Sequence, residues 1–203
     1  MLVLQDETTE DISIMAGVSP NEDSYFGTSV FRHAKNRSLW LMLLMLSATV
    51  TGEILGYYED AMAVMPVLIT FIPMLMGTGG NCGSQSSTLV IRGLAVGEIE
   101  FKDIFKVIFK EIRIALVVGV LLSVVNGIRI YIMYDQNIML ALALGITMIA
   151  VVTMAKCIGC ILPLLAKKMG LDPAIMAAPL ITTILDTCTI LVYFNIVTAF
   201  FHI

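Results

Sequence analysis

Charged residues are scarce in this sequence: they make up 14% of its 203 residues, whereas hydrophobic residues make up 58%. A soluble domain carries about 25% charged and about 45–50% apolar residues. No basic run is wide enough to bind nucleic acid. Residues 1–37 are polar and acidic, so they lack the basic start and short apolar core of a secretory signal peptide. These absences predict a membrane protein that does not bind nucleic acid.

Cysteine is also rare, and its placement excludes the usual cysteine chemistry. The four cysteines lie in or beside apolar segments, where a thiol usually acts as a small hydrophobic group, so no disulfide framework is expected. Cys157 and Cys160 match Cys-x-x-Cys, but no histidine is near them in the sequence, which argues against a metal or redox site. No motif for ATP binding is present.

Long apolar segments fill most of the chain. A helix needs about 20 mostly apolar residues to cross about 30 Å of hydrocarbon. We expect five spans, at residues 39–56, 61–91, 112–134, 138–165 and 173–201. Residues 1–37 then form a cytoplasmic N-terminal segment, and residues 38–203 form one transmembrane domain. The predicted fold class is an all-α membrane protein that crosses the cell membrane several times and contacts its lipid.

Lysine and arginine alternate between the loops of this arrangement. They cluster before the first expected span, after the second and after the fourth. Because such loops usually stay in the cytoplasm, the N-terminus is expected there and the C-terminus outside. Five spans cannot divide into two equal inverted halves, so a second copy about a two-fold axis would have to complete a transport pathway.

Asp186 lies near the middle of the last expected span, 13 residues after Pro173 or about 20 Å along a helix. An ionised carboxylate there costs about 3 kcal/mol, so it requires a cavity, a partner or a cation. The alternative is a protonated carboxyl group bonded to a neighbouring helix. Pro179 leaves one backbone carbonyl free within this helix. A polar face is expected from residues spaced by three or four: Ala178, Thr182, Asp186, Thr189 and Tyr193.

A second candidate region lies in the second expected span, at residues 77–87. It holds four glycines and no large side chain, which allows another helix to approach closely. Asn81 and Gln85 lie four residues apart and present amide oxygens on one face. Packing alone explains the glycines but not these two amides at membrane depth. In the fourth span, Lys156 either reaches an interface or pairs with an acid.

The sequence resembles the membrane domain of the MgtE family of magnesium channels along essentially its whole length. The motifs that carry the resemblance are the run from Pro73 to Ser86, the segment from Val90 to Glu98, Asp172 followed by Pro173, and residues 178–186. Residues 9–18 resemble the end of the family's plug helix. The large cytoplasmic domain and the paired CBS domains that usually precede this helix are not found in the sequence.

The resemblance implies a homodimer with five spans per subunit and a pore on the two-fold axis. The family's pore carboxylate corresponds to Asp186, and neighbouring pore positions correspond to Ala178 and Thr182. Asn81 is expected to join these three residues at the pore magnesium site, and further residues are expected to line or pack the pore: Gln85, Gly79, Gly80, Gly83, Pro179 and Thr189. The resemblance also implies a regulatory magnesium site on the cytoplasmic side, formed by Asp172 with Glu10 and Asp11 of the plug helix.

The residue chemistry agrees with a channel or transporter for Mg²⁺, and not with an enzyme. Mg²⁺ prefers oxygen ligands and usually keeps several waters. Two copies of Asp186 near one axis would repel each other, and a divalent cation relieves that repulsion. Three alternatives stay open: a proton-coupled transporter, an intramembrane aspartyl protease (although Asp186 lacks the Gly-x-Gly-Asp context) and a scaffold without transport. Oxygen ligands also suit other hard cations, so the sequence does not rank Mg²⁺ against Mn²⁺, Co²⁺ or Ca²⁺.

Overall fold

The computed structural model describes residues 12–19, 25–134, 137–176 and 178–203, and every regular element in these ranges is a helix. Short 3₁₀ segments of three to six residues, labelled η, separate several of the longer helices. In chain order the elements are α2 (Val30–Tyr57), α3 (Glu59–Val64), η1 (Pro66–Phe71), α4 (Ile72–Ala95), η2 (Phe101–Asp103), α5 (Ile104–Met133), α6 (Ile138–Lys168), η3 (Pro173–Met176) and α7 (Ala178–Phe201).

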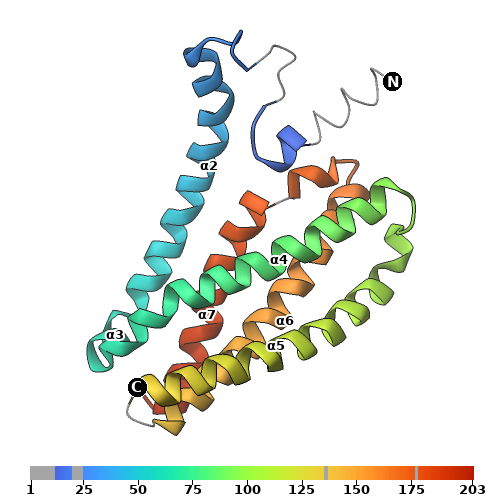
Figure 1. Cartoon of the computed structure of the whole chain (residues 1–203). Helices are drawn as coiled ribbons and strands as arrows, with labels where there is room; N and C mark the ends of the chain where they lie inside the picture. Colours follow the sequence, from blue (N-terminus) through green and yellow to red (C-terminus); the bar gives the residue numbers. More distant parts are fainter. Residues whose placement is uncertain (1–11, 20–24, 135–136, 177) are drawn as a thin grey trace.

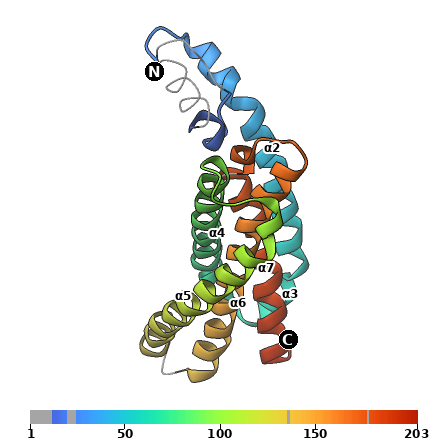
Figure 2. The same ribbon diagram turned by 90° about the vertical axis from the view of Figure 1, so that its right-hand side faces the viewer.

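Five of these helices contain 24 to 31 residues, namely α2, α4, α5, α6 and α7. At 1.5 Å per residue they are about 36–46 Å long, and they run up and down the long axis of the molecule in alternation (Figures 1 and 2). Within the described ranges, three helices are both long and apolar enough to cross a membrane: α2, α6 and α7. The all-helical fold is therefore confirmed, while the count of five spans remains a prediction.

Helix α6 forms the centre of the bundle. It packs against α4, α5 and α7, and buried residues occur along its whole length, from Leu140 to Ala166. Helix α2 lies at the edge, because Thr51 is its only buried residue and α7 is its main neighbour. The Thr51 and Thr187 hydroxyl groups share a hydrogen bond of 2.6 Å that joins these two helices. Most of α2 is thus left for lipid or for another chain to cover.

The helices differ in extent from two of the expected spans. The predicted span at 61–91 is interrupted at Met65, whose backbone leaves the helical conformation (φ −135°, ψ 77°). Pro66 follows it, and a proline disfavours helical backbone at the residue before it. The chain therefore turns through α3 and η1 before α4 begins. Residues 104–111, which precede the expected third span, belong to the same helix as that span, α5.

Candidate functional site

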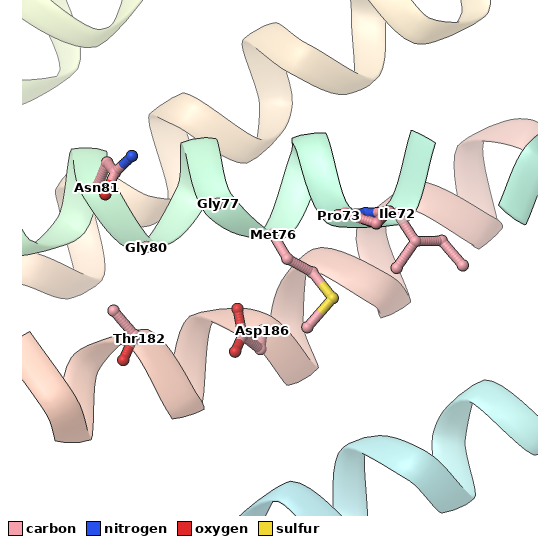
Figure 3. A pocket seen from close by; sticks show the side chains of 8 residues that line it. All are labelled: Ile72, Pro73, Met76, Gly77, Gly80, Asn81, Thr182 and Asp186. Carbon is pink, nitrogen blue, oxygen red and sulfur yellow. The ribbon is translucent and has the colours of Figure 1, made fainter. Parts of the chain in front are cut away.

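A cavity of about 420 Å³ lies between α4 and α7 and contains Asp186 (Figure 3). Helix α7 contributes two polar side chains to it, and α4 contributes small and apolar residues together with one amide. The lining residues are Ile72, Pro73, Met76, Gly77, Gly80, Asn81, Thr182 and Asp186. The structure thus brings together residues from the two regions that the sequence singled out.

The Asp186 carboxylate is half-buried and projects from α7 toward α4 (Figure 3). No hydrogen bond or ion pair joins it to any other group in the described part of the chain. The expected alternative, a carboxyl group bonded to a neighbouring helix, is therefore not the arrangement found. An acidic group that lacks a protein partner and faces a cavity has both oxygen atoms available to a ligand or to water.

Thr182 lies one turn before Asp186 and lines the same cavity. Its hydroxyl group donates a hydrogen bond of 3.0 Å to the carbonyl of Pro179, and Thr183 donates to the same carbonyl at 2.9 Å. Both threonines therefore bond back to their own helix. Gly80 faces Thr182 from α4, and a Cβ atom at this position would lie 3.1 Å from the Thr182 methyl group. Glycine at position 80 keeps this side of the cavity open.

The expected polar face of α7 does not line the cavity along its full length. Thr189 and Tyr193 are each only 1% exposed. The Tyr193 hydroxyl group donates a hydrogen bond of 2.8 Å to the carbonyl of Leu68 in η1. Thr189 packs against α4 at Gly79, and its hydroxyl group has no hydrogen-bond partner among the described residues. Thr189 is therefore a packing residue and does not line the cavity.

A second hollow, of about 600 Å³, opens on the outer face of α4. It is lined by Asn81, Ser84, Gln85, Thr88 and Leu89. Asn81 lines both hollows, so it connects this face with the cavity at Asp186. The expectation that Asn81 and Gln85 share one face of the helix is confirmed. Both side chains are exposed in the single chain.

The remaining predicted positions have other surroundings. Gly83 packs against Leu185 and Ile181 of α7, so it allows close helix contact and does not line either hollow. The Asp172 carboxylate is exposed and accepts a hydrogen bond of 2.8 Å from the backbone N–H of Ala174, which caps η3. Glu10, Asp11 and the side chain of Ala178 lie outside the described residues. Among the described residues, no three histidine, cysteine, aspartate or glutamate side chains gather as a metal site.

A buried polar network joins α4 to α5 and α6 behind the cavity. The Ser86 hydroxyl group donates to the Glu111 carboxylate at 2.6 Å, and the Lys156 ammonium group donates to the Ser86 oxygen at 3.3 Å. Lys156 and Glu111 form an ion pair at 3.8 Å, and all three residues are less than 9% exposed. Lys156 therefore pairs with an acid, which was one of its two expected roles. The burial of Glu111 was not predicted, because no pattern in the local sequence indicates that its side chain faces the interior.

Ser87, the next residue along α4, ties this helix to η3, the segment that precedes α7. Ser87 donates a hydrogen bond of 2.7 Å to the carbonyl of Met176 in η3. The adjacent hydroxyl groups of Ser86 and Ser87 thus hold α4 against two different neighbours. The run of small polar residues at 84–88 was the only sequence signal for these contacts.

Comparison with known proteins gives a consistent result. A sequence model of the MgtE family, described as a divalent cation transporter, matches residues 72–196. A magnesium transporter MgtE from Bacillus subtilis (strain 168) is 36% identical over 196 residues, which are 97% of this chain and 43% of that protein. A magnesium transporter MgtE from Thermus thermophilus is 33% identical over 194 residues, 96% of this chain and 43% of that protein.

The chain spans less than half the length of these curated relatives. The match nevertheless includes both α4 and α7, which form the cavity, and the three apolar helices fit a protein of the cell membrane. An intramembrane protease is not supported, because the family consists of transporters and not enzymes. The chain belongs to the MgtE family of divalent cation transporters.

Proposed function

We propose that this chain forms the membrane pore of a magnesium transporter and that Mg²⁺ passes the cavity between α4 and α7. The observation that carries the proposal is the Asp186 carboxylate, which faces this cavity and has no partner among the residues that the structure describes. The names of the relatives, magnesium transporters, favour Mg²⁺ as the transported ion.

The size of the cavity is compatible with a hydrated ion. Mg²⁺ releases its waters reluctantly, and six waters of about 30 Å³ each occupy about 180 Å³. This volume fits within the cavity of about 420 Å³. In the proposed mechanism, Asp186 supplies charge to the hydrated ion, while the Thr182 oxygen and the Asn81 amide bond its waters. Binding through water keeps the interaction weak enough for the ion to leave.

We further propose that five helices cross the membrane and that the N-terminus is cytoplasmic. All five are longer than the about 30 Å of hydrocarbon, and their alternating directions fit an odd number of crossings (Figure 2). The membrane potential then drives the ion inward, because a divalent cation gains about 4.6 kcal/mol per 100 mV. Conduction as a channel is our preferred mode.

The pore is proposed to lie on the two-fold axis of a homodimer. The outer face of α4 carries Asn81, Gln85 and Thr88, and none of these side chains has a hydrogen-bond partner in the described part of the single chain. Unpaired polar groups are costly against lipid. A second copy facing this surface would enclose it as a water-filled pathway and would bring a second Asp186 toward the ion.

The regulatory magnesium site remains a separate proposal. Asp172 lies at the end of the molecule that we assign to the cytoplasm, and one of its oxygens is used to cap η3. The other oxygen is free to share an ion with Glu10 and Asp11 of the N-terminal segment.

The test of the main proposal is Mg²⁺ uptake by cells that lack their own magnesium transporters. Two opposite unit charges, such as a carboxylate and one charge of the cation, attract by about 4 kcal/mol at a distance of about 4 Å and an effective dielectric constant near 20. We therefore expect Asp186→Asn to reduce uptake by about a hundredfold or more at unchanged protein level. Glu53→Gln is the matched control, because it removes an exposed carboxylate of α2 outside the cavity.

Undiminished uptake by Asp186→Asn would falsify the assignment. Uptake that follows a proton gradient and does not depend on Mg²⁺ would instead favour the proton-coupled alternative. Flux into liposomes with competing Mn²⁺, Co²⁺ and Ca²⁺ would rank the cations and separate a channel from a carrier.

A further inference from the structure

The segment formed by η2 and the first turns of α5 is rich in basic residues, and half of them are already neutralised. Lys102 pairs with Glu100 at 2.7 Å, and Lys106 pairs with Asp103 at 2.9 Å. The hydrogen bond to Glu100 raises the pKa of Lys102, and the hydrogen bond from Lys106 lowers the pKa of Asp103. Both pairs therefore stay ionised at neutral pH, and their charges cancel within the segment.

The next two basic residues, Lys110 and Arg113, have no acidic partner in the described part of the chain. They lie one turn apart on α5 and are both exposed. The Arg113 guanidinium group stacks over the Phe109 ring at 4.7 Å from its centroid, which orients it along the helix surface. Two uncompensated positive charges are thus held side by side.

An apolar strip continues from these charges along the same side of α5. A hollow of about 340 Å³ is lined by Lys110, Arg113, Ile114, Val117 and Val118. One and two turns further on, Leu121 and Val125 are 62% and 61% exposed, and Val117 is 73% exposed. Helix α5 packs on α6, and its buried residues in this region, Glu111, Ala115 and Gly119, lie on another side of the helix, so no described element covers this strip.

We propose that Lys110 and Arg113 bind the phosphate of an anionic phospholipid, whose acyl chain lies over Ile114, Val117 and Val118. This inference rests on the proposed topology, which places this end of α5 at the cytoplasmic surface. A guanidinium group and an ammonium group can both donate hydrogen bonds to the oxygens of one phosphate, and basic clusters at this depth attract anionic lipid. A zwitterionic lipid leaves the two charges uncompensated, because its own cation cancels the phosphate.

The test uses the full chain in bilayers of phosphatidylcholine with a small fraction of spin-labelled lipid. The fraction of label immobilised by the protein is compared for phosphatidylglycerol and phosphatidylcholine. We expect the wild-type chain to prefer phosphatidylglycerol, and each removed cation to reduce this preference by about fivefold. The double variant Lys110→Gln/Arg113→Gln should therefore lose most of it.

The chain supplies a matched control in the preceding turns. Lys102→Gln/Lys106→Gln removes the same number of positive charges, but each of these is already paired with an acid. This variant should keep most of the lipid preference. Equal loss in the two double variants would overturn the proposal, because the effect would then come from net charge alone.

Two other occupants of the surface give different results. If the two residues bind free anions, excess inorganic phosphate should abolish the preference for phosphatidylglycerol, and the lipid site is then excluded. If a second copy covers the strip, Val117→Cys should cross-link two chains, which also excludes a lipid there.

The measurement needs no magnesium flux, so Asp186→Asn should retain the lipid preference. Failure of the transport proposal would therefore be distinguishable from failure of this one.

Discussion

At the scale of single residues, two glycines determine how closely α4 and α6 approach. A Cβ atom on Gly159 would overlap the carbonyl oxygen of Gly83 and would lie 3.0 Å from the Gly83 Cα atom. Both are backbone atoms, which cannot rotate away as a side chain can. Close approach of helices through small residues is a common device in membranes, where van der Waals packing contributes to helix association.

We expect Gly159→Ala to destabilise the protein by about 1–3 kcal/mol, because overpacking forces the two backbones apart. This loss should exceed the gain of about 1 kcal/mol in helix propensity that alanine brings. Thermal unfolding in detergent measures the effect. Gly127→Ala is the control, because nothing lies within 4 Å of the added methyl group. Equal behaviour of the two variants would show that the contact between α4 and α6 is not tight.

At the scale of the helices, the pair formed by Lys156 and Glu111 holds three elements together through Ser86. Removal of one partner of a buried ion pair leaves the other charge without compensation, whereas removal of both can be nearly neutral. The network's residue on α4, Ser86, directly follows Gln85 but lies on a buried side of the helix, whereas Asn81 and Gln85 are exposed. The network therefore stabilises the helix that carries half of the cavity, without contributing a group to the cavity itself.

We expect Lys156→Met to destabilise the protein by about 3–5 kcal/mol. The double variant Lys156→Met/Glu111→Gln should recover most of this loss, because no uncompensated charge then remains in the interior. Unfolding free energies of the two single variants and the double variant form a cycle that isolates the coupling between the two residues. Losses that simply add would mean that the two side chains are not coupled.

At the scale of the whole molecule, the helices that the structure describes leave a polar surface of α4 uncovered. The face of α4 with Asn81, Gln85 and Thr88 is open in a single chain, while the interior of the bundle is largely filled by α6. The outer face of α5 is equally open but apolar. The two surfaces therefore suit different environments: a second copy with water for α4, and lipid for α5.

We expect Asn81→Cys to form a disulfide between two chains under mild oxidation, because the proposed axis brings the two α4 helices together. Val117→Cys should stay monomeric on the same non-reducing gel. Both variants are made in a background whose four native cysteines are replaced by alanine. Cross-linking through Val117 but not through Asn81 would place the dimer interface on α5 and contradict a pore along α4.

Much of the candidate site was predictable from residue type alone. A carboxylate in an apolar run is rare enough to mark Asp186, and amides four residues apart mark one helix face at Asn81 and Gln85. Whether Thr189 lines the cavity or packs beside it could not be decided from the sequence, because helical spacing does not show where a neighbouring helix crosses. The break at Met65 was only partly predictable: Pro66 indicates a bend, but not a separate turn of helix.

The sequence by itself determined that this protein lies in a membrane, that it is helical, and that its last helix holds one acidic residue. These properties follow from composition and local periodicity. The tertiary structure alone decided which polar groups face outward and which are buried. Asp186 faces the cavity while Thr189 and Tyr193 of the same face are covered, because α4 and η1 cross α7 at different heights. Glu111 reaches Lys156 for a similar reason: burial and pairing depend on helices that are far apart in the chain.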